Sequence, residues 1–366
     1  MRPHGWCGMK IDEFYRGKKV FVTGHTGFKG TWLCKLLLYM GATVLGYAKE
    51  PKPEQVLFKL SGVSEKMKSV YGDIQNLQYL EEIMSEFQPE IVFHLAAQPI
   101  VRESYHIPVE TYGINVMGTV NVLESIRNCN GVKSVVNVTT DKVYENKETN
   151  RAYLETDVLN GYDPYSNSKS CSELVTDSYK KSFLNNQGVA VSTCRAGNVI
   201  GGGDFAKDRI IPDCFRAVKS GKEIVLRNPY SVRPYQHVLD PLWAYLLVAK
   251  LQYENRNRYE GAYNIGPDRK DNVTTGELAD LFCKAWGKDA TWKVQESMDN
   301  VHEAKLLYLD CSKIKQKLGW RPVWNISRAV ENTVKWYIAY VAGTDIAACM
   351  DKQIQEFCEG VNDEVY

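Results

Sequence analysis

The chain has 366 residues, of which 44% are hydrophobic and 11% aromatic, so it can bury a large core and does not have the composition of a disordered protein. Its 45 Lys and Arg residues nearly balance its 44 Asp and Glu residues, so charge gives no reason to expect a nucleic acid or an acidic membrane as partner. The apolar runs are short, the first residues lack the apolar core of a signal peptide, and the ten cysteines are scattered without a CxxC pair. We therefore expect a cytoplasmic protein with reduced thiols and no membrane span.

Up to residue 199 the sequence alternates between short apolar, β-rich runs and stretches with the apolar spacing of a helix. The predicted strands are 18–24, 42–48, 90–97, 134–140 and 189–199. The predicted helices between them are 31–41, 79–87, 111–129 and 165–183. Apolar strands that alternate with helices are typical of a parallel sheet with both faces covered. The pattern predicts an α/β fold with a doubly wound parallel sheet, that is, a Rossmann domain.

After residue 200 the pattern changes. Two segments, 201–212 and 226–236, are rich in Gly, Pro and Arg, as expected of loops that grip a ligand, and helices are predicted at 272–286 and 312–322. We interpret this part as a smaller C-terminal lobe that closes over the ligand crevice of the sheet. The expected domains are a dinucleotide-binding domain (17–200, with 237–266), a substrate-binding lobe (201–236 and 267–345) and terminal extensions (1–16 and 346–366).

The segment "VTGHTGFKG" (22–30) places three glycines between the first strand and the first helix. Gly24 would permit a tight turn, Gly27 would let a pyrophosphate approach the backbone, and Gly30 would let the helix pack closely on the strand. The free N–H groups of the helix N-terminus favour phosphate binding. Because strand, glycines and helix come in the required order, we expect a dinucleotide site.

The end of the second predicted strand, "LGYAKE" (45–50), lacks the Asp that would bind a ribose. Glu50 is close, but it stands beside Lys49, so the choice between NAD and NADP stays open at this point. Asp73 either accepts a hydrogen bond from the adenine amino group or caps the helix that follows it.

Tyr165 and Lys169 are four residues apart on a predicted helix, so both side chains lie on one face. A cationic lysine near a phenol would lower the pKa of the phenol towards the working pH. The pair follows the "VTTDKVY" segment (138–144) and a glycine-rich loop, which favours a catalytic role over an ordinary surface pair.

At this point the chain resembles the extended short-chain dehydrogenase/reductase family, in its nucleotide-sugar branch. The motifs that carry the resemblance are "TGHTGFKG", "HLAAQ", "NVMGT", "VTTDKVY", "YSNSK", "RAGNVIGGGD" and "YNIG", between residues 23 and 266. The resemblance implies NAD as cofactor, and Thr140, Tyr165 and Lys169 as the catalytic triad. The cofactor site that it implies also contains Gly24, Thr26, Gly27, Phe28, Lys29, Gly30, Asp73, Ile74, Leu95, Ala96 and Ala97.

Within that branch the chain is most similar to the 4,6-dehydratases that act on CDP-glucose in deoxysugar biosynthesis. The segments concerned are "GHTGFKGTWL", "AAQPIVRESY", "DPYSNSK", "GGGDFAKDRIIPD" and "RPYQHVLDPL". Sugar-nucleotide 4,6-dehydratases in general carry an Asp-Glu pair where this chain has Asp141-Lys142. The resemblance implies oxidation at carbon 4 of the sugar, loss of water across carbons 5 and 6, and return of the hydride to carbon 6. Asp141, kept protonated, is the natural acid for the leaving hydroxyl, and Lys142 could be the base only in its neutral form.

The substrate diphosphate needs cations, and Arg209 and Arg233 lie in the two loops rich in Gly and Pro, where Arg suits bidentate phosphate contact. We expect Asn198 to bond the diphosphate, Gln98 to line the sugar pocket and Arg227 to contact the base. Asn115, within a helix, is expected to support the active-site backbone instead.

Some alternatives stay open. His94 and His237 suggest a metal site, but no ligand cluster surrounds them in the sequence, and we expect no metal. A sugar-nucleotide 4-epimerase shares the cofactor and the first chemical step. A non-catalytic NAD-binding regulatory protein would not need the Thr140, Tyr165 and Lys169 triad. Family likeness also implies a homodimer, formed through helices at 116–126 and 172–179.

Overall fold

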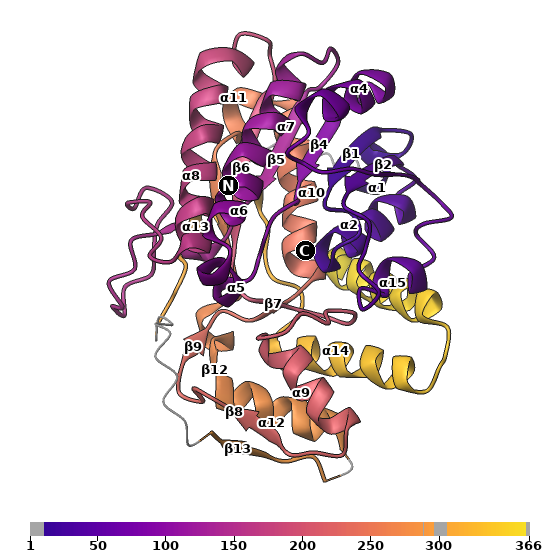
Figure 1. Cartoon of the computed structure of the whole chain (residues 1–366), viewed down its shortest axis with the longest axis vertical. Helices are drawn as coiled ribbons and strands as arrows, with labels where there is room; N and C mark the ends of the chain where they lie inside the picture. The colour runs from indigo at the N-terminus through magenta and orange to yellow at the C-terminus, as the bar shows by residue number, and fades with distance from the viewer. Residues whose placement is uncertain (1–10, 288, 296–305, 364–366) are drawn as a thin grey trace.

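The computed structural model describes residues 11–287, 289–295 and 306–363. Its centre is a sheet of seven parallel strands in the order β11-β6-β5-β4-β1-β2-β3 (Figure 1). The strands are β1 Lys19–Thr23, β2 Thr43–Ala48, β3 Lys68–Tyr71, β4 Ile91–His94, β5 Ser134–Val138, β6 Ala190–Ala196 and β11 Ala262–Ile265. The strand order reverses between β1 and β4, and in such sheets a ligand binds at the carboxyl ends of the strands at this point.

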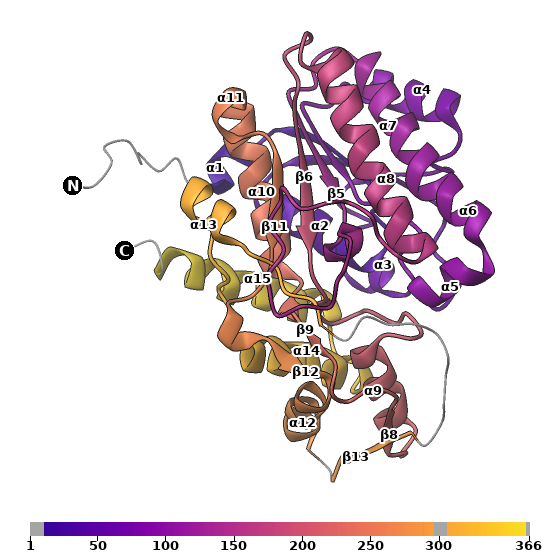
Figure 2. The ribbon, with the colours of Figure 1, turned by 90° about the vertical axis from the view of Figure 1, so that its left-hand side faces the viewer.

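Successive side chains of the strands point to opposite faces of the sheet, and each face has its own helical cover. Phe21, Val92 and Val135 pack with apolar residues of α4 (Leu77–Phe87) and α7 (Gly118–Arg127). On the other face, the core that contains Val20 and Phe93 includes residues of α2 (Phe28–Tyr39) and α10 (Leu239–Glu254). Figure 2 shows the strands between these layers, with α8 (Pro164–Tyr179) beside α7. The predicted doubly wound fold is confirmed.

The predicted elements are present, with shifted ends. All five predicted strands occur. The run predicted at 189–199 is divided, because β6 ends at Ala196 and a separate strand, β7 (Val199–Ile200), follows it. The single helix expected over 111–129 is divided into α6 (Pro108–Tyr112), a π-helical turn η1 (Gly113–Met117) and α7. The helix expected over 165–183 likewise ends in a π-helical turn, η3 (Lys180–Leu184).

The lobe below the sheet in Figure 1 contains α9 (Ile210–Lys219), α12 (Thr275–Trp286) and α14 (Ile326–Val341). A capping box between Thr274 and Glu277 begins α12, so the capped helix predicted there is confirmed. Three short strand pairs complete this region: β7 with β10 (Gln236–His237), β8 (Ile224–Leu226) with β13 (Trp292–Val294), and β9 (Val232–Arg233) with β12 (Val273–Thr274). The remaining short elements are α3 Leu57–Leu60, α5 Val101–His106, η2 Asp141–Val143, α11 Arg256–Tyr259, η4 Arg269–Asp271 and α13 Ser312–Leu318.

Helices near both ends of the described chain pack on the body of the protein. In α1 (Ile11–Tyr15) the buried Tyr15 donates a hydrogen bond to the Leu246 carbonyl of α10, at 2.8 Å. The last helix, α15 (Ile346–Asp363), buries Met350 and Phe357 in the main core. Across the described ranges, the helices are too short or too polar for any of them to span a bilayer.

Candidate active site

The loop after β1 has the geometry of a phosphate cradle. Gly24 has φ +74°, and a Cβ at this position would lie 2.8 Å from the Ala96 nitrogen, so both the turn and the close approach of the β4 end require glycine. A Cβ on Gly30 would collide with the Gly24 carbonyl oxygen, so α2 can start this close to β1 only with glycine there. Gly27 stands at the N-cap of α2 and makes no side-chain cap, so the first-turn N–H groups of the helix can bind a phosphate. These residues fit a dinucleotide.

Other predicted cofactor residues lie around the ends of β1 and β4. The Thr23 hydroxyl accepts hydrogen bonds from the N–H groups of Leu95 and Ala96, both at 3.1 Å, which fixes the 95–97 segment beside Gly24. Thr26 donates to the Lys49 carbonyl (3.2 Å). Phe28 and Ile74 are packed into the apolar interior, Phe28 near Gly201 and Ile74 against Gly118.

Asp73 follows β3 and has partners within the protein: Lys49 Nζ lies 3.1 Å from its Oδ2, and the Gln75 N–H donates to its Oδ1. The alternative role as a helix cap is wrong, because Asn76 caps α4 by accepting from the Tyr79 N–H. β2 ends at Ala48, and Glu50 beyond it is exposed.

The two histidines considered as metal ligands are buried among other partners. His94 Nδ1 bonds the Thr23 hydroxyl and Nε2 bonds Thr119, and burial lowers the pKa of His94 to about 3. His237 is packed between Trp32 and Trp324, and burial lowers its pKa to about 3 as well. Within the described ranges, no group of three His, Cys, Asp or Glu side chains is arranged to hold a metal ion.

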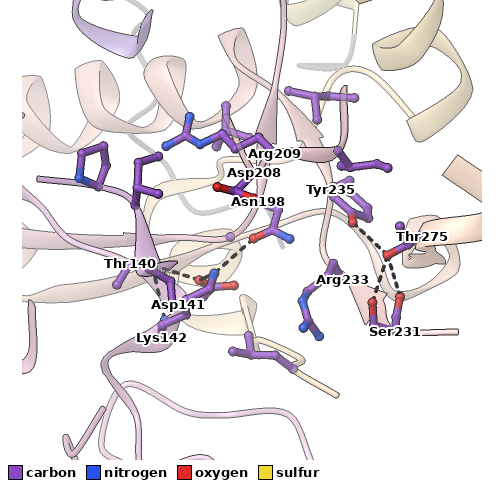
Figure 3. Close-up of a pocket in the computed structure, with 18 of the residues that line it drawn as sticks. Thr140, Asp141, Lys142, Asn198, Asp208, Arg209, Ser231, Arg233, Tyr235 and Thr275 are labelled. Carbon is purple, nitrogen blue, oxygen red and sulfur yellow. Dashed lines mark hydrogen bonds and ion pairs between the residues drawn. The ribbon is translucent and has the colours of Figure 1, made fainter. Parts of the chain in front are cut away.

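A cavity of about 390 Å³ lies between the carboxyl ends of β5 and β6 and the C-terminal lobe (Figure 3). The structure brings most of the predicted substrate and catalytic residues together around it. Those that line it are Lys29, Thr140, Asp141, Lys142, Tyr165, Asn198, Arg209, Arg227 and Arg233.

Asp141 and Lys142 come directly after β5, in the short turn η2 that Thr140 caps. Asp141 is buried, and its Oδ1 accepts two hydrogen bonds, from the Thr140 hydroxyl (3.0 Å) and from Lys142 Nζ (3.0 Å). Its other oxygen, Oδ2, has no hydrogen-bond partner among the described residues. A buried carboxyl oxygen without a partner is costly, so a ligand hydroxyl in the cavity would be a favourable partner for it.

Tyr165 and Lys169 project from the first turns of α8, which Pro164 and the Asp163 cap start. Burial raises the pKa of Tyr165 to about 12, while its hydrogen bond with Thr140 and the charge of Arg209 act in the opposite direction. Lys169 Nζ donates to the Val138 carbonyl (3.2 Å), and burial lowers the pKa of Lys169 to about 8. The expectation that Lys169 lowers the Tyr165 pKa is therefore wrong for this structure, since burial dominates and Arg209 is the cation that opposes it.

Lys29, expected at the cofactor, lines the same cavity. Burial, together with the charges of Arg209, Lys169 and Lys142, lowers the pKa of Lys29 to about 7, and the charge of Asp141 acts in the opposite direction. Lys29 is thus close to the reacting groups and belongs to a strongly cationic wall.

The three arginines predicted to contact the substrate, Arg209 and Arg233 at the diphosphate and Arg227 at the base, already have partners within the protein. Arg209 Nη1 lies 2.8 Å from Asp204 Oδ2, and Arg227 Nη1 lies 2.9 Å from Asp208 Oδ1. The buried Arg233 donates to the Val232 carbonyl at 3.1 Å, and Figure 3 shows its guanidinium in the space between Lys142 and Ser231.

Asn198 is placed beside the catalytic pair. Its Oδ1 accepts a hydrogen bond from Lys142 Nζ (3.1 Å), and Tyr235 lines the same cavity. Tyr235 in turn bonds Thr275 (3.3 Å), whose hydroxyl lies 2.9 Å from that of Ser231.

Gln98 does not line the cavity. Its amide nitrogen donates to the Ile100 carbonyl (3.2 Å) and to Thr111 (3.0 Å), which holds its own loop. Asn115 accepts from the Gln98 N–H (2.9 Å) and donates to the Gln98 carbonyl (3.1 Å), so the predicted backbone support is confirmed.

Several residues of the cavity wall were not predicted from the sequence. They are Arg102, Asp204, Asp208, Ser231, Tyr235 and Thr275. Arg102 was within reach of prediction, because it follows β4 in the "AAQPIVRESY" segment, where the sheet ends in a ligand site. Ser231, Tyr235 and Thr275 carry no such signal, since Thr275, which bonds the other two, is about 40 residues away from them in the sequence.

Comparison with known proteins agrees with this site. The profile of the family described as GDP-mannose 4,6 dehydratase matches residues 21–333. A curated relative, the CDP-glucose 4,6-dehydratase of Salmonella typhimurium, is 45% identical over 95% of this chain and 98% of its own length. The dTDP-glucose 4,6-dehydratase of Streptomyces antibioticus is 30% identical over 87% of this chain and 92% of its own.

Solved structures of the same fold include the UDP-glucose 4-epimerase of Thermus thermophilus in complex with NAD. It is 26% identical, with a TM-score of 0.76, over 87% of this chain and 99% of that one. A dTDP-glucose 4,6-dehydratase of Streptomyces venezuelae with NAD bound has a TM-score of 0.77 at 24% identity, over 89% and 99% of the two chains. The family profile matches most of the chain, and the glycine loop and the Tyr165–Lys169 pair agree with it. The chain therefore belongs to the GDP-mannose 4,6 dehydratase family of extended short-chain dehydrogenases/reductases.

Proposed function

We propose that the chain is a nucleotide-sugar 4,6-dehydratase that converts CDP-glucose into CDP-4-keto-6-deoxyglucose and water, with NAD as its cofactor. The observation that carries the proposal is the pair Asp141–Lys142, which lines a cavity with a cationic wall together with Tyr165 and in which the buried Asp141 Oδ2 has no partner among the described residues. The 45% identity to the Salmonella enzyme supports the choice of reaction and substrate.

The glycine loop, the N-terminus of α2 and the 95–97 segment would hold NAD, with Lys169 at its nicotinamide ribose. When bound, NAD accepts a hydride at the start of the reaction and gives it back at the end. The task of the chain is to place the sugar, to move protons and to exclude water from the cavity.

In the first stage Tyr165 takes the proton of the sugar 4-hydroxyl. Thr140 donates to Asp141 Oδ1 (3.0 Å), and Thr140, Asp141 and Tyr165 line the same cavity, so the proton-transfer groups lie together. The pKa of about 12 means that Tyr165 is neutral near pH 7 in this structure. It can accept the sugar proton only as the phenolate, so its own proton must first leave to the solvent, and the nearby cations stabilise the phenolate that results.

In the second stage the proton on carbon 5, acidified by the 4-ketone, passes to the Lys142 amine. The electron pair of that C–H bond forms the double bond to carbon 6, the C6–O bond breaks, and the oxygen takes a proton from Asp141 and leaves as water. Asp141 suits the role of acid, because Oδ1 accepts two hydrogen bonds and Oδ2 is left to carry the proton towards the substrate.

Four cations of the cavity could face the substrate diphosphate: Lys29, Arg102, Arg209 and Arg233. Arg209 has the partner Asp204, with which the diphosphate would have to compete, and Arg227 has the partner Asp208. Arg227 lies next to β8, at the lobe end of the cavity, where the base would lie.

We also infer a cytoplasmic homodimer. Large apolar side chains are exposed on the neighbouring helices α6, α8 and the turns η1 and η3: Val109, Tyr112, Met117, Leu174 and Phe183. Such a patch is typical of an interface between copies of a chain. Leu174→Lys should shift the protein from dimer to monomer in sedimentation, and a wild type that sediments as a monomer would refute the dimer.

The test of the function is incubation with CDP-glucose and NAD, with dTDP-, UDP- and GDP-glucose in parallel. We expect a 4-keto-6-deoxy product from CDP-glucose. A 4-epimer without loss of water would instead identify an epimerase, the activity named for the Thermus neighbour of the same fold. Tight NAD binding without turnover of any of these sugars would favour the regulatory protein.

A further inference from the structure

At the lobe end of the cavity, an ion pair lines the wall. Asp208 Oδ1 lies 2.9 Å from Arg227 Nη1, and both residues line the cavity. Arg227 follows β8, whose Val225 is 47% exposed and lines the cavity too, so it offers an apolar surface that suits a base. Figure 3 shows Asp208 apart from the catalytic turn η2. The pair therefore lies where the nucleotide end of a substrate would be, away from the reacting sugar.

Stability does not explain why this pair is there. The Arg227 side chain is 33% exposed and the Asp208 side chain 38% exposed, and an ion pair in such contact with water adds little to the free energy of unfolding. Asp208 also has φ +60°, a left-handed backbone that is uncommon for a residue other than glycine. Arg102 Nε, on α5, lies 3.9 Å from the same Oδ1, so the carboxylate is held from two sides. An uncommon backbone conformation at the wall of a cavity points to a role in binding a ligand.

The pair keeps hydrogen-bonding capacity for a ligand. Both ion pairs that Asp208 makes with described residues use Oδ1, so Oδ2 can accept a hydrogen bond from a bound molecule. Arg227 uses one N–H of Nη1 on Asp208, and its guanidinium has further N–H groups on Nη1, Nη2 and Nε. The wall therefore presents an acceptor next to a group of donors.

The pairing edge of cytosine has the complementary groups in the same order. Its N4 amino group donates, and its N3 and O2 atoms accept. In uracil and thymine the acceptor O4 takes the place of the amino group, and N3 carries a hydrogen. Against this wall, O4 would face the carboxylate and the N3–H would face the guanidinium, so both contacts would be repulsive.

We propose that Asp208 and Arg227 form a base-reading pair: Asp208 accepts a hydrogen bond from the amino group of cytosine, and Arg227 donates to the ring acceptors of the same base. The proposal rests on the dehydratase function above and names the residues that select CDP-glucose among pyrimidine nucleotide sugars. Selection comes from the repulsive contacts with the wrong base as well as from the attractive contacts with the right one.

The test is the ratio of the dissociation constants of UDP and CDP, measured by calorimetry on the protein loaded with NAD. The wild type should bind CDP more tightly than UDP by roughly 5- to 150-fold, the discrimination that a good pair of base contacts gives. In Asp208→Asn, CDP and UDP should bind about equally. Asn tolerates the left-handed backbone, and its amide group can turn either its oxygen or its N–H₂ group towards the base.

Arg227→Met tests the other half of the pair. It removes the donors but keeps a long side chain, so it should weaken the binding of CDP and lower the ratio. Asp213→Asn is the matched control, because Asp213 also lines the cavity and is paired with an arginine, Arg216. Loss of either carboxylate favours any diphosphate, but this effect cancels in the ratio. Asp213→Asn should therefore leave the ratio unchanged.

Equal binding of CDP and UDP by the wild type would overturn the proposal. An unchanged ratio in Asp208→Asn, or an equal fall of the ratio in Asp213→Asn, would overturn it as well. Failure of the proposed function looks different, because the measurement does not depend on turnover. In that case the wild type would give no keto-deoxy product from CDP-glucose, whatever its ratio of dissociation constants.

Discussion

Glu173 of α8 and Arg195 of β6 form a two-pronged ion pair behind the active-site wall. Arg195 Nε lies 2.9 Å from Glu173 Oε1 and Arg195 Nη2 lies 2.8 Å from Oε2, with both side chains about 4% exposed or less. Thr139 and Thr193 donate to the same carboxylate, so the pair ties β5, just before the catalytic turn, to β6 and α8.

Breaking this pair should destabilise the whole protein. Glu173→Gln keeps the shape of the side chain but leaves the Arg195 charge buried without its partner, which costs about 3–5 kcal/mol in the free energy of unfolding. Glu86→Gln is the control, because its ion pair with Lys68 is exposed on both sides and should be worth less than about 1 kcal/mol. Urea denaturation of the two variants measures the difference, and equal losses would refute the importance of the buried pair.

The buried histidines predict a loss of stability in mild acid. The pKa of His94 and of His237 is lowered from 6.5 to about 3, so between these values the unfolded chain binds protons that the folded protein cannot. Stability is therefore complete above pH 6.5 and falls as the pH falls, by about 1.4 kcal/mol per pH unit for each histidine.

Denaturation at pH 7 and pH 5 tests this slope. His237→Asn removes one titrating ring and can keep the acceptor for the Leu239 N–H that Nδ1 provides. The variant should be less stable than wild type at pH 7 because it leaves space, but it should lose less stability on going to pH 5. Parallel losses in the two proteins would contradict the prediction.

The sequence predicted the sheet well because buried parallel strands such as 134–140 are continuous apolar runs. It did not predict α10, since Leu239–Glu254 is buried on almost all sides and has little helical periodicity. β3 was also missed, because Lys68–Tyr71 is a four-residue strand at the sheet edge.

The chemistry of the site was predictable where it followed a local order. Asp141, Lys142 and Tyr165 were found because each follows a strand or begins a helix in a fixed position. Tyr235 was not predicted to line the cavity, because Thr275, to which its hydroxyl is bonded, is far from it in the sequence and meets it only through the fold.

The cofactor should be held weakly compared with relatives that have a carboxylate for the ribose. In this chain β2 ends at Ala48, Glu50 is exposed, and the Lys49 side chain is paired with Asp73. We expect dialysis to remove NAD and added NAD to restore the activity. Retention of one NAD per chain through dialysis would contradict this, and tighter binding of NADP than of NAD would show that Lys49 reads a 2′-phosphate.

Tyr165 should be needed from the first chemical step. Tyr165→Phe removes the group that accepts the 4-hydroxyl proton, so no near-ultraviolet absorbance of reduced cofactor should appear when CDP-glucose is added. Tyr179→Phe on the same helix is the control, because its hydroxyl bonds Glu124 far from the cavity, and it should react like the wild type. Formation of the reduced cofactor in Tyr165→Phe would mean that another group takes this proton.

Asp141 should be needed only after that step. Asp141→Asn keeps the hydrogen bonds to Oδ1 but cannot release a proton from its amide group at neutral pH, while Tyr165, Thr140 and Lys169 are unchanged. With CDP-glucose the variant should still form reduced cofactor and then stall before water leaves, with a loss of roughly 100- to 10,000-fold in the overall rate, as expected for a missing general acid. Stopped-flow absorbance and product analysis separate the two stages. If the absorbance never appears although the variant is folded and binds substrate, Asp141 acts in the first step. If turnover is normal, Asp141 and Lys142 are an ordinary ion pair and the elimination depends on other groups.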